Sequence, residues 1–371
     1  MRDPKPIREV TVPGVLAERQ RNCASTSSAS PGCNSIQWRR LARLALGLLL
    51  AASLASPRGF ATTRFWVAGP VDSGNWSVAR NWSPAGVPQD GDDLVFTATE
   101  EQSSLRHDMN NDLVGLRIRR FEFCGYSWMV AGNELTLLEH VDRYGGCGAS
   151  SVVFNCPIKL GNSTRANIGW GSIIFRGNID LNGNNLTLIS GDQIIVSGQI
   201  SGAGNVFAVI DAFIEDRESV LRFDGPLGNT FSGQMVVSRL YRDRGYVVFD
   251  KESGAVVNDV LVVGDRSGIN SRPAVCKLAR SHQIGDNATV SISGGSQFLL
   301  EGNTETIGSL CMTNSATDVQ PTLVDTGGST LSVLGDIIAV NNAAAVVPTI
   351  RGKLGLPGPA AAKTSTTQSK P

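Results

Sequence analysis

Between Ser190 and Ile338 the chain consists of short stretches in which apolar and polar residues alternate, as in Thr289 to Ser293. Pairs containing Gly, Asn or Asp separate these stretches, and almost no helical period is present. Alternation places every second side chain on the same side of an extended strand, so it is typical of half-buried β-strands. Many short strands at close spacing predict a stacked, all-β architecture.

Two phrases recur along the sequence. Residues 132–138 (GNELTLL) return as residues 183–189 (GNNLTLI), and the triplet at 294–296 (GGS) returns at 327–329. Such recurrence is typical of a repeat protein. We therefore expect a parallel β-helix, or β-solenoid, in which each strand pairs with the equivalent strand of the next rung, ~4.8 Å away.

The alternation also predicts which residues face the core. The expected inward-facing residues are Leu135, Leu137, Leu186, Leu188, Val290, Ile292, Leu331 and Val333, whereas Thr136, Thr187, Ser291 and Ser332 are expected to face outwards. Corners are expected at Gly183–Asn184, Gly264–Asp265, Gly285–Asp286, Gly302–Asn303 and Gly335–Asp336, because Gly, Asn and Asp tolerate the backbone of tight turns. No long helix is expected after Ala61.

The composition favours one elongated body over several compact domains. The 371 residues include 41 Gly, only 6% aromatic and only 18% charged residues, which suits many short strands and tight corners. The 33 basic and 33 acidic residues balance, so the chain lacks the excess positive charge with which proteins hold nucleic acid or acidic membranes. Nucleic acid is therefore excluded as an expected partner.

Residues 1–61 are interpreted as an N-terminal extension followed by a secretory signal. Arg39, Arg40 and Arg43 precede an apolar stretch at 44–52, and small residues follow, which is the order of a signal peptide. Cleavage is expected after Ala61, with 53–55 as the alternative. The apolar stretch is shorter than the ~20 residues that span a bilayer, so we expect no stable membrane span after cleavage and a secreted or cell-surface location. The Arg39–Arg40 pair leaves a twin-arginine route open.

Five cysteines follow this segment: Cys124, Cys147, Cys156, Cys276 and Cys311. Secreted disulfide scaffolds are normally small, rich in cysteine and even-numbered. We therefore expect these cysteines to act as small apolar core residues. A bridge between Cys147 and Cys156, or between Cys124 and Cys147, remains an alternative.

Residues 62–96, which we name the Trp-rich segment, are expected to cover the N-terminal end of the solenoid. Trp66, Trp76 and Trp82 would supply core where short strands provide little, and would protect the first strand from pairing with other chains. The alternative is that these rings stack on sugars. The solenoid is expected to span residues 97–354, followed by a disordered tail at 355–371.

Three stretches carry a family resemblance. Residues 190–205 (SGDQIIVSGQISGAGN), 221–225 (LRFDG) and 229–237 (NTFSGQMVV) resemble, in this order, the autotransporter-associated β-strand repeat. The resemblance extends more weakly over Phe65 to Gly352. It implies a right-handed β-helical passenger exported to the bacterial surface, and it carries over no catalytic residue. The sequence after Leu354 lacks the alternating strands of an outer-membrane barrel, so we expect a shortened member of the family.

Motifs for catalysis or metal binding are missing from the sequence. His107, His140 and His282 occur in no metal-binding spacing, and Glu139, His140 and Asp142 are expected to lie at a solvated corner. Asp90, Asp92 and Asp93 are expected in a solvated turn, with calcium binding as the alternative. We predict no catalytic, cofactor-binding or metal-binding residues.

An enzymatic alternative is a polysaccharide lyase or glycosidase, since parallel β-helices host such activities. Two charged stretches could supply its groups: Asp211, Glu215, Asp216, Arg217, Glu218 and Arg222, and Arg239, Arg242, Asp243 and Arg244. The charges of both stretches also suit the soluble surface of a solenoid. We therefore expect a non-catalytic structural or adhesive protein, with surface polysaccharide, matrix or other cells as partners.

Overall fold

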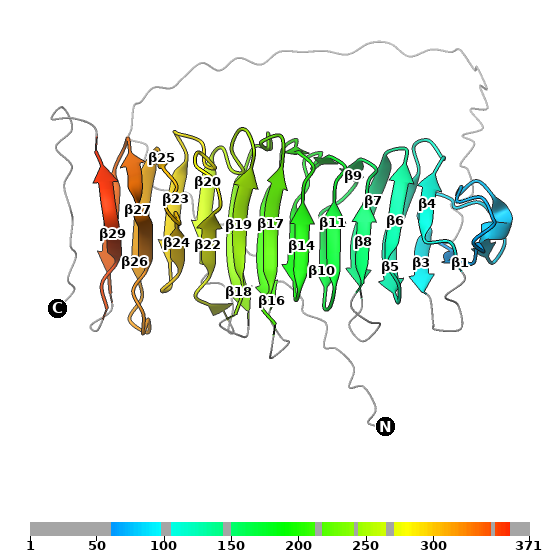
Figure 1. Cartoon of the computed structure of the whole chain (residues 1–371), viewed down its shortest axis with the longest axis horizontal. Helices are drawn as coiled ribbons and strands as arrows, with labels where there is room; N and C mark the ends of the chain where they lie inside the picture. Colours follow the sequence, from blue (N-terminus) through cyan, green and yellow to red (C-terminus); the bar gives the residue numbers. More distant parts are fainter. Residues whose placement is uncertain are drawn as a thin grey trace, which may run out of the picture. The chain divides into compact units, whose positions relative to one another are not determined.

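The structure is a computed structural model that describes residues 61–97, 105–143, 150–211, 217–240, 244–264, 271–342 and 346–356. All of them belong to one compact unit. They form a β-solenoid of stacked parallel strands (Figure 1), which confirms the predicted fold class. The predicted signal before Ala61 and the tail after residue 356 lie outside the described residues.

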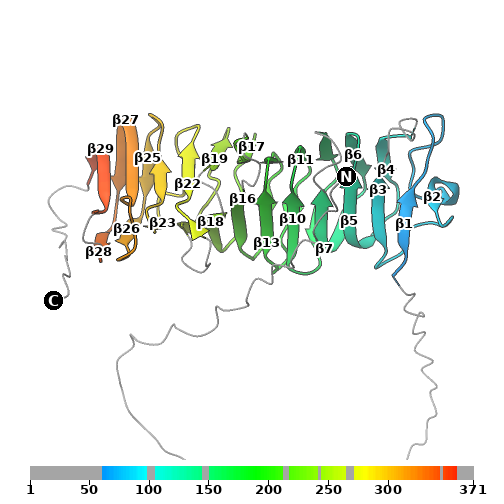
Figure 2. The ribbon, with the colours of Figure 1, turned by 90° about the horizontal axis from the view of Figure 1, so that it is seen from below.

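The strands make two sheets on opposite sides of the solenoid (Figure 2). Sheet A contains β1 (Thr63–Trp66), β2 (Trp82–Ser83), β3 (Asp93–Thr97), β5 (Arg117–Cys124), β7 (Leu135–Arg143), β9 (Ile158–Leu160), β10 (Thr164–Ile168), β12 (Ile179–Asp180), β13 (Leu186–Ser190), β15 (Ile200–Ser201), β16 (Val206–Asp211), β18 (Gln234–Leu240), β20 (Val260–Val263), β21 (Ser271–Arg272), β23 (Thr289–Ser293), β26 (Ser309–Asn314) and β28 (Ile337–Asn341).

Sheet B contains β4 (Asp108–Asn111), β6 (Trp128–Gly132), β8 (Ser151–Phe154), β11 (Ser172–Phe175), β14 (Gln193–Val196), β17 (Val220–Gly225), β19 (Tyr246–Lys251), β22 (Val275–Leu278), β24 (Gln297–Leu299), β25 (Glu305–Ile307), β27 (Leu323–Val333) and β29 (Thr349–Gly355). The helical structure in the described residues is a single 3₁₀ turn, Ala79–Asn81. No helix in this part of the chain is long and apolar enough to cross a membrane.

Successive rungs pair in register although their lengths differ. Leu186 pairs with Val206, and Val206 pairs with Met235. More residues separate the second pair in the sequence than the first. The paired segments nevertheless keep the same alternation of inward and outward side chains. The solenoid therefore tolerates insertions between strands without losing its core.

The recurring sequence phrases occupy different places in the rung. Leu135 at the start of β7 pairs with Ile158 of β9, whereas Leu186 of β13 pairs with Thr164 of β10. The long strand β7 covers both positions, because its later residues pair with β10. The two phrases are thus similar because each contains a glycine corner followed by an alternating strand. They do not occupy equivalent positions in the rung.

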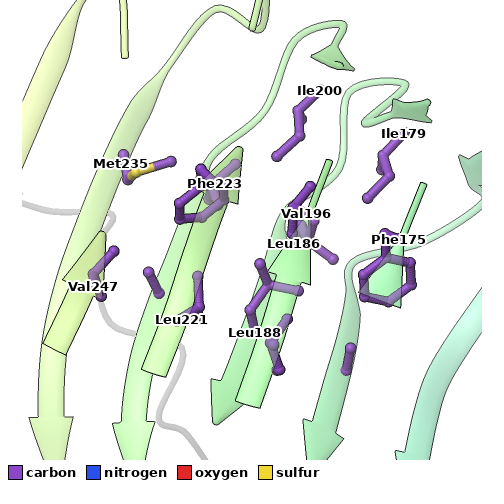
Figure 3. Packing of buried hydrophobic residues seen from close by; sticks show 14 of the residues in the cluster. Phe175, Ile179, Leu186, Leu188, Val196, Ile200, Leu221, Phe223, Met235 and Val247 are labelled. Carbon is purple, nitrogen blue, oxygen red and sulfur yellow. The ribbon is translucent and has the colours of Figure 1, made fainter. Parts of the chain in front are cut away.

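The core consists of apolar side chains stacked in columns along the axis (Figure 3). All eight residues predicted to face inwards are buried, and Thr136, Thr187, Ser291 and Ser332 are partly exposed as expected. Phe175 and Val196 of sheet B lie opposite Leu186 and Leu188 of sheet A, so each rung closes around its own pair of apolar faces.

Glycines at the corners serve two different purposes. Gly183 and Gly302 adopt positive φ angles of 81° and 84°, a conformation that other residues rarely take. Gly335 instead allows close stacking, since a Cβ atom there would lie 2.4 Å from the carbonyl oxygen of Gly308 in the preceding rung. A corner glycine is therefore needed either for the turn or for the contact between rungs.

The Trp-rich segment is buried at the N-terminal end of the solenoid. Trp66, Trp76 and Trp82 are at most 2% exposed, and the rings of Trp66 and Trp82 meet edge to face with centroids 5.0 Å apart. Trp76 also stacks on Phe96 of β3. The three rings are therefore not available for stacking on sugars in this structure.

The described cysteines follow the prediction in part. Cys156 and Cys276 are free and fully buried, and Cys311 is free and partly exposed on an outward position of β26. The alternative bridge between Cys147 and Cys156 is therefore wrong. Cys124 is disulfide-bonded, and its partner lies outside the described residues, as does Cys147.

The inward and outward assignment leads to a paired test. Changing Ile292→Asp should lower the free energy of unfolding by about 3 to 5 kcal/mol, because it buries an unpaired charge. Ser291→Asp should change it by less than about 0.5 kcal/mol, because Ser291 faces outwards. Denaturant titration followed by circular dichroism measures both values, and equal losses for the two variants would contradict the assignment.

Candidate functional site

A ladder of charged residues runs along the outer face of sheet B. Asp224 of β17 and Asp250 of β19 are register partners in neighbouring rungs. Arg222 lies against both, with its Nε atom 3.7 Å from Asp224 Oδ2 and an Nη2 hydrogen bond to Asp250. Arg280 of the following rung donates its Nε–H to Asp250 at 2.8 Å. The ladder thus links three rungs, and both of its carboxylates are paired with arginine.

Aromatic rings and further charges border this ladder. Arg217 lies 5.1 Å from the ring centre of Trp170 and 3.2 Å from Asp192 Oδ2. The Nζ atom of Lys277 lies over the ring of Tyr246, 3.9 Å from the ring centre. Burial, followed by the nearby charge of Glu218, raises the pKa of Tyr246. We name Arg217, Glu218, Arg222, Asp224, Tyr246, Asp250, Lys277 and Arg280 the sheet B cluster.

The residues of the predicted enzymatic alternative do not all come together. Arg217, Glu218 and Arg222 belong to the sheet B cluster, whereas Asp211 ends a strand of sheet A. Burial raises the pKa of Asp211 to about 6, and its Oδ1 atom has no hydrogen-bond partner in the described structure.

The second charged stretch, residues 239–244, contributes less to the outer face of sheet B. Arg239 is buried in sheet A and donates an Nη1 hydrogen bond to the Gly245 carbonyl. Arg244 is exposed at the corner that leads into β19. Glu215, Asp216, Arg242 and Asp243 lie outside the described residues.

A hollow of about 300 Å³ lies on the outer face of sheet A. The side chains that line it are Glu139, His140, Ser163, Thr164, Arg165 and Thr187. Asp142 holds two of them in place, with its Oδ2 atom 3.3 Å from His140 Nε2 and 3.4 Å from the Arg165 guanidinium. The hollow presents one cation, several hydroxyl groups and an exposed carboxylate, a set of groups that can hydrogen-bond a sugar.

The expected solvated corner at this place is wrong. His140 and Asp142 lie within β7, and Asp142 is only 6% exposed. Strand pairing brings Arg120 and Arg165 to either side of His140. Alternation alone could not reveal these neighbours, because they come from other rungs.

The expected solvated turn is correct for Asp90 only. Asp92 and Asp93 are 2% and 1% exposed. Asp92 pairs with Arg64, and Asp93 pairs with Arg119 and Arg120. Burial acts to raise the pKa of Asp93, but hydrogen bonds and charge from the two arginines outweigh it and lower the pKa. Asp92 and Asp93 are thus both paired with arginine. The described residues contain no group of side chains suited to hold a metal ion.

A second hollow, of about 410 Å³, lies at the corner between β26 and β27. Its lining includes Arg272, Ser315, Asp318 and Gln320. The Ser315 hydroxyl donates to Asp318 Oδ1 at 2.6 Å, and Gln320 donates to the Gly295 carbonyl at 2.9 Å. Sequence reasoning missed this hollow, although the polar run between two apolar strands indicated a longer corner there.

Charged groups also lie inside the solenoid, where the sequence analysis placed none. Lys251 is fully buried and donates from Nζ to the Gly198 carbonyl at 2.9 Å, and burial lowers its pKa to about 8. Glu305 is fully buried and accepts the backbone N–H of Gln283 at 2.7 Å, and burial raises its pKa to about 7. The alternation Val247, Phe249, Lys251 was the available signal, because it places Lys251 on an inward position.

Comparisons with models of known protein families, with curated proteins and with solved structures found no match for this chain. The family resemblance therefore rests on the sequence phrases alone.

The buried carboxyl group of Glu305 predicts a pH dependence of stability. Its pKa is higher in the folded than in the unfolded state, so the folded state binds more protons between about pH 4.5 and 7. Stability is therefore expected to fall as the pH rises through this range, by about 1 to 3 kcal/mol from this group.

Denaturant titrations at pH 5 and pH 7.5 measure the effect. Glu305→Gln removes the contribution of Glu305 and should weaken the dependence, leaving the part that comes from Asp211, whose pKa burial raises to about 6; Glu301→Gln, at an exposed position, should leave the dependence unchanged. Identical pH dependence in wild type and Glu305→Gln would show that Glu305 does not titrate in this range.

Proposed function

We propose that the chain is an exported, non-catalytic β-solenoid of the autotransporter-associated repeat type that adheres to polysaccharide, matrix or other cells. The observation that carries this proposal is the in-register stacking of rungs. Such stacking places outward-facing side chains at ~4.8 Å intervals along two faces. A repeating ligand can therefore contact many rungs at once.

The outward groups suit weak, repeated contacts with sugars. On sheet A the column Arg120, His140, Arg165 and Thr187 continues over four rungs. The hollow around His140 and Arg165 is open and shallow, so a single sugar unit would bind weakly there. Many weak contacts along one ligand combine into a strong one, since effective concentration multiplies each further contact.

A polysaccharide lyase or glycosidase is the second candidate, and one observation favours it. Asp224 and Asp250 lie on neighbouring rungs, a spacing of ~4.8 Å that is close to the ~5 to 5.5 Å between carboxyl groups in retaining glycosidases. Both groups are held by Arg222, however, and an acid or nucleophile must reach the substrate. The arrangement favours a structural ion-pair ladder over a catalytic pair.

Incubation of the purified chain with acidic and neutral polysaccharides separates the two functions. Binding without turnover is expected, with the polymer held at least tenfold more tightly than a short oligosaccharide of the same sugar. Release of reducing or unsaturated ends that disappears in Asp250→Asn, or when Arg217, Glu218 and Arg222 are replaced, would establish the enzymatic alternative. Sedimentation with insoluble polymer and a reducing-end assay provide the two readouts.

Export is tested by fusion of residues 1–75 to a reporter protein in a bacterial cell. The reporter should leave the cytoplasm and be cleaved near Ala61, because the segment has basic residues, an apolar stretch and small residues in signal order. Replacing Leu48 and Leu49 with Asp should keep it inside, since a charged segment no longer acts as a signal. A wild-type fusion that stays full-length in the cytoplasm would contradict the proposal.

A further inference from the structure

The two ends of the solenoid differ in how their last strands are covered. At the N-terminal end, β1 pairs with β3 on one edge and with antiparallel β2 on the other. At the C-terminal end, β29 pairs with β27 on one edge, and no strand in the described residues pairs with its other edge. Figure 1 shows β29 as the last strand of the stack, at the end opposite to β1.

On the edge of β29 that faces away from β27, backbone groups have no partner strand among the described residues. Thr349 and Lys353 direct their N–H groups towards β27, to the Thr322 carbonyl and to Thr326 Oγ1. Successive residues of a parallel strand direct their backbone groups to opposite edges. Ile350 and Leu354 therefore direct their N–H and C=O groups to the free edge, where they can pair with a further strand.

The inward side chains of β29 are also incompletely covered. Ile350 and Leu354 pair with Val324 and Leu331 of the preceding rung. Val324 and Leu331 are fully buried, whereas Leu354 is 38% exposed and Ile350 is partly exposed. A further strand with apolar inward residues would cover these two side chains as β29 covers those of β27.

The outward side chains indicate the charge of that strand. Arg351 lies 3.2 Å from Asp325 and keeps an exposed side chain, and Lys353 is exposed with no ion pair in the described structure. In a dimer, the β29 strands of two copies could pair antiparallel, with Gly352 at the centre. Arg351 of one copy would then face Lys353 of the other. Like charges in facing positions destabilise a strand pair, so the edge disfavours a second copy.

We propose that the free edge of β29 binds an extended segment of another polypeptide by β-strand addition. The segment carries apolar residues at inward positions, over Ile350 and Leu354, and acidic residues at outward positions, beside Arg351 and Lys353. Backbone hydrogen bonds supply affinity, and the alternating side chains supply specificity. This interaction is separate from adhesion through the two faces of the solenoid.

Fluorescence anisotropy of labelled eight-residue peptides tests the proposal with the full chain. A peptide of alternating Val and Glu should bind, and one of alternating Val and Lys should bind about two- to fivefold more weakly for each reversed charge pair. Lys353→Glu should remove most of this preference, because Arg351 still favours the acidic peptide, and the double change Arg351→Glu with Lys353→Glu should reverse it. Absence of binding by the Val–Glu peptide, or equal binding of both peptides, would overturn the proposal.

Leu354→Pro supplies the decisive variant. Proline removes the N–H that faces the free edge and leaves the Lys353 N–H bond towards β27 in place, so the strand is kept but its addition site is blocked. Leu356→Pro, just after β29, is the matched control and should bind the Val–Glu peptide like the wild type. Circular dichroism melting curves verify that both variants fold.

Two further results would refute the proposal. One is Val–Glu binding that Leu354→Pro leaves unchanged in a folded protein. The other is a dimer of the full chain in sedimentation that Leu354→Pro dissociates, since this would make a second copy the occupant of the edge.

Discussion

Parallel hydrogen bonding between successive rungs is the constraint on which the other features of this solenoid depend. Each rung must present its backbone in register with the next, so an inward residue always stacks on an inward residue, as Leu186 does on Val206. Because the core column is continuous, most of its members are apolar, and a charged member such as Lys251 is held by hydrogen bonds inside the solenoid. The same constraint aligns the outward positions of successive rungs, so backbone pairing determines which outward side chains become neighbours, such as Arg120, His140 and Arg165.

This constraint explains how much of the fold the sequence could predict. Alternation identifies inward residues such as Ile292 and Val333 correctly because a strand has a period of two, whichever rung it belongs to. Rung equivalence is a property of pairing between distant segments, so the similar phrases around Leu135 and Leu186 do not reveal it. Both phrases contain a glycine corner followed by an alternating strand, which every corner of a solenoid can use.

The sites were less predictable for the same reason. Asp93 follows Asp90 and Asp92 in the sequence, yet its partners Arg119 and Arg120 belong to the next rung. His140 meets Arg165, and Asp250 meets Arg222, only because pairing joins rungs that are far apart in the sequence. A carboxylate that looks solvated in the sequence can therefore be buried and paired with arginine. Lys251 was detectable, because it continues an alternating run of inward residues.

Stacking also divides the molecule into parts that can and cannot change. Columns within strands are fixed by their neighbours on both sides, whereas corners are bounded only by the strands they join. The length of chain between register partners differs from rung to rung, and the hollow lined by Asp318 and Gln320 lies at one of the longer corners. Outward positions within strands recur at each rung with different side chains, as in the column Arg120, His140, Arg165 and Thr187. The core therefore constrains the residues within strands, whereas the corners can differ in length and in side chains without altering it.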